Sequence, residues 1–362
     1  MINHEIYIKR CLQIAKNGIG TTRPNPSVGA LIVLNNKIIA EGFTSKYGKS
    51  HAEVNAVNAV NDKSVLRDAT IYVTLEPCSH FGKTPPCADL LAKHKFKNVV
   101  IGCKDTNDLV AGKGIERIQK AGINVIIGVL EDECREHHKR FFTVQDKKRP
   151  YIILKWAETK DGFVAPLEKD SQAPVWISNK YSQQIVHKLR AKEHAILVGT
   201  NTVIADNPKL NVRTWSGNNP IRIVLDKNLR IPKEANIYDK SVKTIILCDV
   251  KSLALKKSDF INNVSLIDET KEHQLVFESI NFNQNLAQEI CDVLQKHKIQ
   301  SVIIEGGTQT LQTFIDANLW DEAKVFIGDN TFKTGIKSPI LSAKFTSERK
   351  IKKDILKIYN ND

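Results

Sequence analysis

The sequence contains no long hydrophobic segment. None of its apolar runs approaches the ~20 residues that a membrane-spanning helix needs, and the N-terminus, MINHEIYIKR, lacks the basic-then-apolar order of a signal peptide. The seven cysteines are an odd number scattered over 362 residues, so a disulfide framework is not expected. We therefore expect a cytoplasmic protein without a membrane partner.

Aromatic residues are few, at 7%, and acidic residues are fewer than basic ones, with 40 Asp+Glu against 53 Lys+Arg and a net charge of +13. The hydrophobic content of 41% excludes a disordered chain and is typical of a globular protein. The basic surplus is diffuse. It fits a solvated surface, and it also fits attraction to anionic ligands, which are phosphorylated metabolites or nucleic acid.

The length predicts two domains, and both halves alternate between helices and strands. A charged amphipathic helix is expected at 131–143. The polar segment 145–150 follows it and ends in Pro150, so we place the domain boundary there and expect domains at 1–146 and 147–362. In the first half, helices are expected at 5–16, 51–61, 87–94 and 114–121, and strands at 29–34, 37–43, 69–75, 98–103 and 124–128. In the second half, helices are expected at 180–191, 285–297 and 310–317, and strands at 151–155, 195–199, 221–226, 244–248 and 301–305.

The first half carries a candidate metal site. His51, Cys78 and Cys87 offer one imidazole and two thiolates, which suit tetrahedral Zn2+ with a fourth position for water. Taken singly, such residues fit a solvated helix end and small core cysteines. Glu53 follows in a His-x-Glu pattern, and Pro77 precedes the first cysteine, an order typical of zinc nucleobase deaminases, in which the glutamate carries protons.

Eight residues separate the two cysteines, more than in most nucleoside and nucleic-acid deaminases. This segment contains His80 and Lys83. A loop of this length can reach over a substrate and present its cations to a phosphate group.

Several segments of the first half resemble the deaminase half of the bifunctional riboflavin-biosynthesis deaminase/reductase family. They are PNPSVG at 24–29, TLEPCSH at 74–80, GKTPPCAD at 82–89 and VAGKG at 110–114. The resemblance implies a cytidine-deaminase-like three-layer α/β/α domain that deaminates 2,5-diamino-6-ribosylamino-4(3H)-pyrimidinone 5′-phosphate. It implies zinc ligands at His51, Cys78 and Cys87, proton transfer by Glu53, and substrate contacts from Asn25, His80, Lys83, Asp105 and Asn107. Thr44 stands where many members have a substrate-contacting histidine.

The second half offers a weaker signal. An apolar strand at 301–305 runs into Gly306-Gly307 and then a helix, and such a turn lets a phosphate approach backbone N–H groups. It also fits a simple tight turn. No Gly-x-Gly-x-x-Gly fingerprint is present, so a dinucleotide-binding Rossmann domain is not supported.

Further segments resemble the reductase half of the same family, among them TKDG at 159–162, WIS at 176–178, HKLRA at 187–191, ADNP at 205–208 and LNVR at 210–213. The resemblance implies a dihydrofolate-reductase-like α/β domain that uses NADPH to reduce the ribosyl group to ribityl. It implies substrate contacts from Arg190, Leu210, Arg213 and Glu305, and cofactor contacts from Ala157, Trp176, Thr202, Asp206, Gly307, Thr308, Gln309 and Thr310. Pro174 replaces a substrate-contacting serine that is common in the family.

Two other functions remain open on the sequence. One is a nucleic-acid-editing deaminase, which the basic charge favours, although aromatics are few and no Arg-rich patch adjoins His51. The other is a single-activity zinc deaminase with a non-catalytic second domain. Our preferred prediction is the bifunctional enzyme, acting on a small phosphorylated pyrimidine without a nucleic-acid partner and forming a homodimer or higher homo-oligomer.

Overall fold

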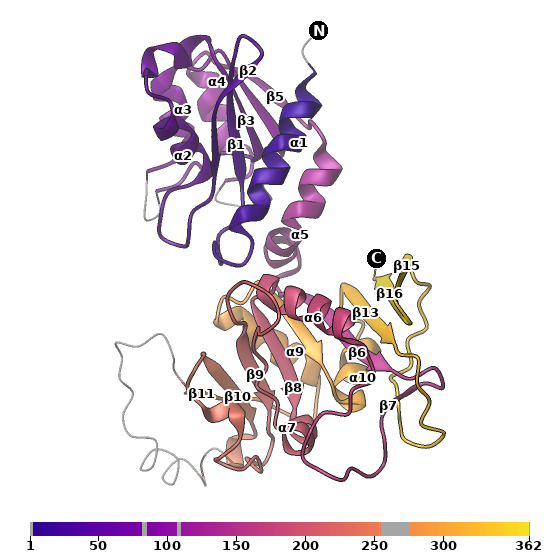
Figure 1. Cartoon of the computed structure of the whole chain (residues 1–362). Helices are drawn as coiled ribbons and strands as arrows, with labels where there is room; N and C mark the ends of the chain where they lie inside the picture. Colours follow the sequence, from indigo (N-terminus) through magenta and orange to yellow (C-terminus); the bar gives the residue numbers. More distant parts are fainter. Residues whose placement is uncertain (1–2, 82–84, 107–109, 253, 255–274, 362) are drawn as a thin grey trace. The chain divides into compact units, whose positions relative to one another are not determined.

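The structure, a computed structural model, describes residues 3–81, 85–106, 110–252, 254 and 275–361 (Figure 1). The chain divides into two compact units, Met1–Lys148 and Arg149–Asp362. The sequence places the boundary two residues earlier, between residues 146 and 147. Each unit has a β-sheet of its own.

The first unit is built on a five-stranded sheet with the order β2-β1-β3-β4-β5. Its central strands are almost wholly buried, as expected for apolar runs covered on both faces. Strand β1 is antiparallel to both of its neighbours, β2 and β3, whereas β3, β4 and β5 run parallel to one another. The strands are β1 (Gly29–Leu34), β2 (Lys37–Phe43), β3 (Thr70–Leu75), β4 (Asn98–Cys103) and β5 (Asn124–Ile127).

Helices cover both faces of this sheet. In Figure 1, α1 and α5 lie on one face, and α2, α3 and α4 lie on the other, which gives the three-layer α/β/α arrangement that the sequence predicts. Close packing depends on Gly102 of β4, because a Cβ there would lie 2.3 Å from Sγ of Cys134 in α5. The helices are α1 (His4–Ala15), α2 (Ala52–Ala59), α3 (Cys87–His94), α4 (Lys113–Lys120) and α5 (Glu131–Lys147), with short 3-10 turns η1 (Lys16–Gly18) and η2 (Lys63–Asp68).

The helix α5 corrects one expectation. The sequence predicts its end at Thr143 and a polar linker after it, but the helix continues to Lys147. Residues 144–147 contain no helix breaker, and the helix ends only where Lys148 adopts a left-handed φ of 53° ahead of Pro150. The extra turn carries Gln145 into the first unit.

The second unit is built on a nine-stranded sheet with the order β11-β10-β9-β8-β12-β6-β13-β16-β15. The seven strands from β11 to β13 run parallel, and β16 and β15 close the sheet in antiparallel pairs. A small pair, β7 with β14, is antiparallel. The strands are β6 (Tyr151–Glu158), β7 (Phe163–Ala165), β8 (Ala195–Gly199), β9 (Ile221–Leu225), β10 (Thr244–Cys248), β11 (Leu275–Ser279), β12 (Ser301–Glu305), β13 (Glu322–Ile327), β14 (Ile336–Lys337), β15 (Ser347–Ile351) and β16 (Asp354–Asn360).

A hydrophobic core lies on each face of this sheet, because successive strand residues point to opposite faces. Ile152 and Leu154 pack with α9 and α10, whereas Ile153 packs with α6 and α7. The sequence predicts the mostly parallel order but not α7 or the strands after residue 320. The helices are α6 (Lys180–Lys192), α7 (Thr200–Asp206), α9 (Leu286–Lys296) and α10 (Thr308–Asp316), with the 3-10 turn η3 (Asn236–Tyr238).

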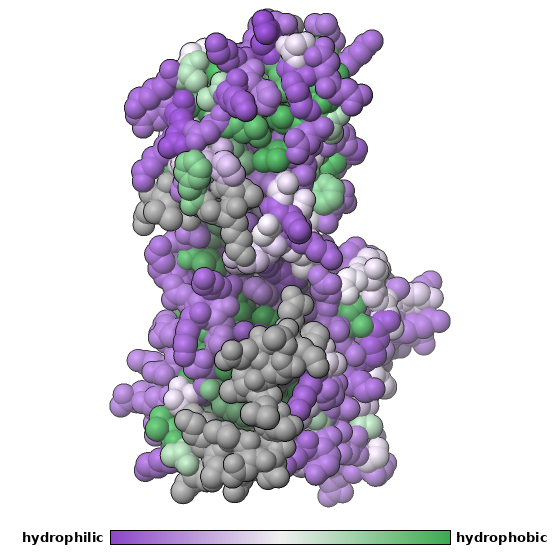
Figure 2. Space-filling view, turned by 90° about the vertical axis from the view of Figure 1, so that its left-hand side faces the viewer, coloured by the Kyte–Doolittle hydropathy of each residue, from purple (hydrophilic) through white to green (hydrophobic). Residues whose placement is uncertain are grey.

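The surface is largely polar. The face in Figure 2 is predominantly hydrophilic on both units, with small separate apolar areas. Within the described ranges, no helix is both long enough and apolar enough to cross a membrane.

Candidate active sites

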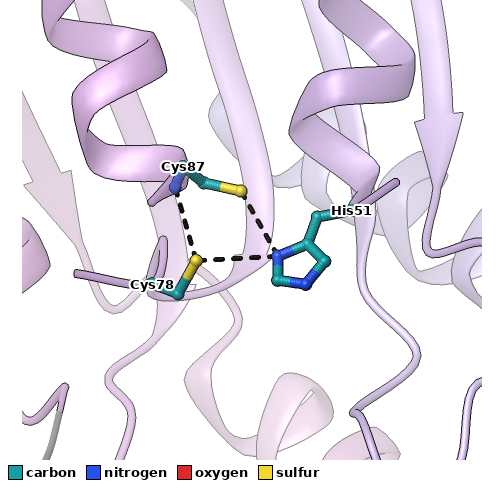
Figure 3. A group of neighbouring side chains, drawn as sticks. All are labelled: His51, Cys78 and Cys87. Atoms are coloured by element: carbon teal, nitrogen blue, oxygen red, sulfur yellow. Dashed lines mark hydrogen bonds between the residues drawn. The ribbon is translucent and has the colours of Figure 1, made fainter. Parts of the chain in front are cut away.

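His51, Cys78 and Cys87 converge in the first unit. His51 caps the start of α2, Cys78 follows β3, and Cys87 is the first residue of α3. The three candidate ligand atoms lie within 4.8 Å of one another. The Nδ1 atom of His51 lies 3.6 Å from Sγ of Cys78 and 3.4 Å from Sγ of Cys87, and Figure 3 shows both thiols turned toward this ring nitrogen.

The electrostatics of the cluster favour a thiolate. Hydrogen bonds from Cys87 and His51 lower the pKa of Cys78 to about 4, although burial opposes this shift. The hydrogen bond to Cys78 in turn raises the pKa of His51. The backbone N–H of Cys87 also donates to Sγ of Cys78, at 3.3 Å. One imidazole and two sulfur donors at this spacing fit the protein ligands of a tetrahedral zinc ion with one open position.

Glu53 lies beside this cluster. It is the second residue of α2, its side chain is buried, and it lines the same pocket as His51 and Cys78. Burial raises the pKa of Glu53, and the nearby Cys78 raises it further. A carboxyl group in this position can serve as a proton carrier for a reaction in the pocket.

A pocket of about 470 Å³ contains these groups. The sequence-predicted residues that line it are Asn25, His51, Glu53, Cys78, His80 and Asp105. Thr44 also lines it, but its hydroxyl accepts a hydrogen bond from the N–H of Val28, at 3.0 Å. Cys87 is buried and is not among the lining residues, and Lys83 and Asn107 fall outside the described residues.

Sequence reasoning missed several lining residues. Lys49 lies only two residues before His51, and this nearness to the motif is a signal from which its place in the pocket could be predicted. Phe141 and Gln145 lie on α5. Gln145 belongs to the last turn of this helix, where the sequence predicts a linker. Glu76 lies inside the TLEPCSH segment but carries no predicted role.

A second cluster of charges lies in the second unit, at the carboxyl end of β12. Glu305 accepts from Nζ of Lys155 at 2.7 Å and from Nη2 of Arg190 at 2.6 Å. Burial would raise the pKa of Glu305, but Arg190 and Lys155 lower it to about 2. Within the described residues, the Nε of Arg190 is buried and has no hydrogen-bond partner, so this guanidinium retains a donor for a ligand.

Further basic groups surround this pair. Arg213 donates through Nη1 to Oδ1 of Asn211 at 2.7 Å, and Arg190 donates to the carbonyl of Asn211 at 3.2 Å. Burial, together with Arg190 and Arg213, lowers the pKa of His187 to about 4. Lys155 and Arg190 therefore share one buried carboxylate, and Arg213 lies near enough for its charge to interact with Arg190 and Glu305. This excess of positive charge suits an anionic ligand.

The predicted cofactor residues lie around the same sheet edge. Gly306 and Gly307 have φ values of 77° and 70°, and a Cβ on Gly306 would lie 3.1 Å from Cγ2 of Thr202. Thr310 lies against Gly307 as well. This bend leads directly into α10, and the first N–H groups of a helix suit an anionic group.

The other residues that are predicted to contact a ligand in the second unit differ in their position and burial. Ala157 lies near the carboxyl end of β6, and Asp206 pairs with Lys169 at the end of α7. Trp176 is 59% exposed. Leu210 is only 2% exposed and packs in the core, so any ligand contact there would come from its backbone.

Two family models match the chain. Residues 1–103 match the cytidine and deoxycytidylate deaminase zinc-binding region, and residues 150–332 match the RibD C-terminal domain. The riboflavin biosynthesis protein RibD of Aquifex aeolicus is 39% identical over 332 residues, which cover 91% of this chain and 88% of that protein. The RibD protein of Escherichia coli is 35% identical, covering 89% of this chain and 87% of that protein.

Solved structures agree with these matches. A diaminohydroxyphosphoribosylaminopyrimidine deaminase/5-amino-6-(5-phosphoribosylamino)uracil reductase from Thermotoga maritima has a TM-score of 0.84 at 33% identity, covering 99% of both chains. Acinetobacter baumannii RibD has a TM-score of 0.84 at 29% identity, covering 99% of this chain and 98% of that one. These matches confirm the fold classes expected for the two halves. The chain belongs to the family of the riboflavin biosynthesis protein RibD.

Proposed function

We propose that the chain is a bifunctional enzyme of riboflavin biosynthesis. Its first unit, 1–146 in the division expected from the sequence, hydrolyses the exocyclic amine of 2,5-diamino-6-ribosylamino-4(3H)-pyrimidinone 5′-phosphate. Its second unit, 147–362, reduces the ribosyl group of the product to ribityl and forms 5-amino-6-(5-phosphoribitylamino)uracil. The observation that carries the proposal is the cluster of His51, Cys78 and Cys87, two of which, His51 and Cys78, line one pocket with the buried carboxyl of Glu53.

In the deaminase, His51, Cys78 and Cys87 would hold Zn2+. Zinc bound there lowers the pKa of water, so that a hydroxide nucleophile is available near neutral pH. Glu53 takes the proton of the attacking water and delivers it to the departing amine. A C–O bond forms, the C–N bond breaks, and ammonia leaves, so the exocyclic amine is replaced by a carbonyl oxygen.

The rest of the pocket would recognise the substrate. Asn25 and Asp105 lie on its wall and suit the polar edge of the pyrimidine. His80 and Lys49 also line it, and the ammonium group of Lys49 and the ring nitrogens of His80 suit hydrogen bonds to the ribose phosphate. Lys83 and Asn107 stay proposed contacts.

In the reductase, Arg190, Arg213 and Glu305 would hold the substrate, with the backbone of Leu210 beside them. The two guanidiniums suit bidentate contact with the phosphate, and the Nε of Arg190 offers the free donor described above. NADPH bound in this unit would supply a hydride to the sugar carbon attached to the exocyclic nitrogen. The new C–H bond would form as the bond from this carbon to the ring oxygen breaks, and a proton from solvent would convert that oxygen to a hydroxyl, so the ring opens. Glu305 is fixed by Lys155 and Arg190, so it can orient the sugar without moving.

The cofactor would lie along the carboxyl edge of the parallel strands, where ligands of open α/β sheets bind. Gly306 and Gly307 precede α10 and lie against the hydroxyl groups of Thr202 and Thr310, so backbone N–H groups and two hydroxyls at this helix start suit a phosphate. The residues proposed for this contact are Ala157, Trp176, Thr202, Asp206, Gly307, Thr308, Gln309 and Thr310.

Small phosphorylated pyrimidines, rather than nucleic acid, are the proposed partners. The cytoplasm is the proposed location, which the free thiols of all seven cysteines support.

We also propose a homodimer or higher homo-oligomer, since β15 ends the large sheet and leaves one of its edges to pair. Light scattering after size-exclusion chromatography tests this assembly.

Zinc dependence tests the two activities separately. The zinc-loaded protein should release ammonia from the diaminopyrimidine substrate, and a chelator should stop this release until zinc is restored. NADPH oxidation with the already deaminated substrate should survive the chelator. Ammonia release that is indifferent to chelation contradicts the proposed deaminase mechanism.

A further inference from the structure

Glu76 uses both carboxylate oxygens to bind backbone N–H groups. Its side chain is 4% exposed and lies just after β3. Oε1 accepts from the N–H groups of Gly114 at 3.1 Å and Ile115 at 3.3 Å, and Oε2 accepts from those of Gly112 at 3.1 Å and Asp105 at 3.3 Å. One buried carboxylate therefore collects four donors from residues that are distant in sequence.

Three of these donors belong to the beginning of α4. The residue before this helix is Gly112, which has no side chain to cap it, so the first N–H groups of α4 need an acceptor from elsewhere. The carboxylate of Glu76 supplies it, and its negative charge also suits the positive end of the helix dipole. Gly114 brings the helix close, because a Cβ there would lie 2.1 Å from the carbonyl oxygen of Pro77.

The fourth donor links this anchor to the substrate pocket. The N–H of Asp105 is held by Glu76, and the side chain of Asp105 lines the pocket. On the other side, Pro77 and then Cys78 follow Glu76 directly in the chain. Glu76 thus joins a wall of the pocket to the segment that carries a candidate metal ligand.

We propose that Glu76 is a positioning residue of the deaminase, which fixes Asp105 and the start of α4 against the segment that carries Cys78. This inference rests on the proposed deaminase activity. Glu76 itself lines the pocket, but backbone N–H groups already bind both of its carboxylate oxygens. It therefore acts through Asp105 and governs how well the pocket accepts substrate rather than whether the metal binds.

Glutamine is the informative replacement because it has the same shape. Its amide has one acceptor oxygen, and its NH2 group would face two N–H donors in place of an oxygen. Glu76→Gln therefore loses one of the two acceptor oxygens and places an NH2 group against backbone N–H groups, which repel it. Glu76→Asp keeps two acceptor oxygens on a shorter arm, so its effect should be smaller. Glu116→Gln is the matched control, because this carboxylate lies on α4 but is exposed and pairs with Lys120.

The experiment compares the three variants with the wild-type enzyme as full-length, zinc-loaded protein. Zinc per chain, the deaminase KM and kcat, and the reductase rate on deaminated substrate are measured on the same preparations. For Glu76→Gln we expect full zinc content, an unchanged reductase rate and a deaminase KM raised by about tenfold or more, with a smaller change in kcat. Glu76→Asp should recover part of the affinity, and Glu116→Gln should resemble wild type.

Hydrogen exchange gives a second readout that does not need activity. The amides of Gly112, Gly114 and Ile115 should exchange faster in Glu76→Gln than in the control. An unchanged KM, a loss of zinc, or unchanged exchange at these amides overturns the inference. Wild-type protein that releases no ammonia contradicts the proposed function instead, and the exchange rates then still decide whether Glu76 holds α4.

Discussion

Nη2 of Arg190 lies 2.6 Å from Oε2 of Glu305, and both side chains are buried. This ion pair connects α6 to the carboxyl end of β12, and Lys155 of β6 binds the other oxygen of the same carboxylate. A buried charge is tolerated only when it is paired, so removal of the shared carboxylate leaves two cations facing each other. Removing one partner of the pair should therefore destabilise the second unit and disturb the proposed phosphate contacts of Arg190.

Glu305→Gln should destabilise the second unit by about 3–5 kcal/mol, because it leaves buried cations without their counter-charge. Urea unfolding followed by tryptophan fluorescence measures this, since all four tryptophans (Trp156, Trp176, Trp215 and Trp320) lie in that unit. Asp329→Asn, which breaks an exposed pair with Lys160, is the control and should leave the unfolding midpoint close to that of wild type. Equal effects of the two substitutions contradict the structural role of the buried pair.

Glu53→Gln should lower the deaminase kcat by about 10²–10⁴-fold, because the proton carrier is lost while the candidate ligands remain. Zinc content and the reduction of deaminated substrate should stay at wild-type levels. Metal analysis and the two assays on one preparation measure this. If the variant loses zinc, Glu53 has been assigned the wrong role.

Lys49→Ala should raise the deaminase KM for the phosphorylated substrate by about tenfold, as expected for a lost charge-assisted hydrogen bond. The KM for the dephosphorylated nucleoside should not change. Lys46→Ala removes an exposed lysine of the same loop that does not line the pocket, so it serves as the control. A rise of equal size for both substrates shows that Lys49 does not contact the phosphate.

The first unit should lose stability as the pH falls below about 6.5. His138 is buried and its Nε2 lies 3.1 Å from Oγ1 of Thr74, and burial lowers its pKa well below the ordinary value of 6.5. The folded unit thus binds this proton less readily than the unfolded chain, so stability is full above pH 6.5 and declines below it.

The decline is at most about 1.4 kcal/mol per pH unit for one histidine. Calorimetric unfolding of zinc-loaded protein across this range measures it. His138→Gln keeps a hydrogen-bonding group but no titration, so its profile should be flatter than that of wild type. Identical profiles exclude His138 as the source.

The sequence predicts the deaminase site better than the reductase site, and the reason is local. The residues of the deaminase motif lie in short sequence patterns at the ends of helices and strands that the sequence predicts. The structure brings all four together, namely His51, Glu53, Cys78 and Cys87. By contrast, Lys155 and Glu305 meet only because β6 and β12 are neighbours in the sheet, although 150 residues separate them. No local sequence pattern predicts a contact between two residues so far apart in the chain.

The sequence also misjudges features that depend on tertiary contacts. The polar residues after Thr143 look like a linker, but they continue α5 and bring Gln145 to the pocket. Leu210 stays a proposed substrate contact, but the sequence does not indicate that its side chain lies in the core and leaves only its backbone for a ligand. The four hydrogen bonds of Glu76 could not be read from its motif, because its partners are backbone groups from another part of the chain.

The most direct test of the account is a mass-spectrometric analysis of the products that zinc-loaded protein forms from the diaminopyrimidine ribosyl phosphate, with NADPH omitted or present. We expect the reaction to stop at the deaminated ribosyl compound without NADPH and to continue to the ribityl compound with it. If NADPH leaves the product unchanged, the second unit is not a reductase of this substrate and the bifunctional assignment is wrong.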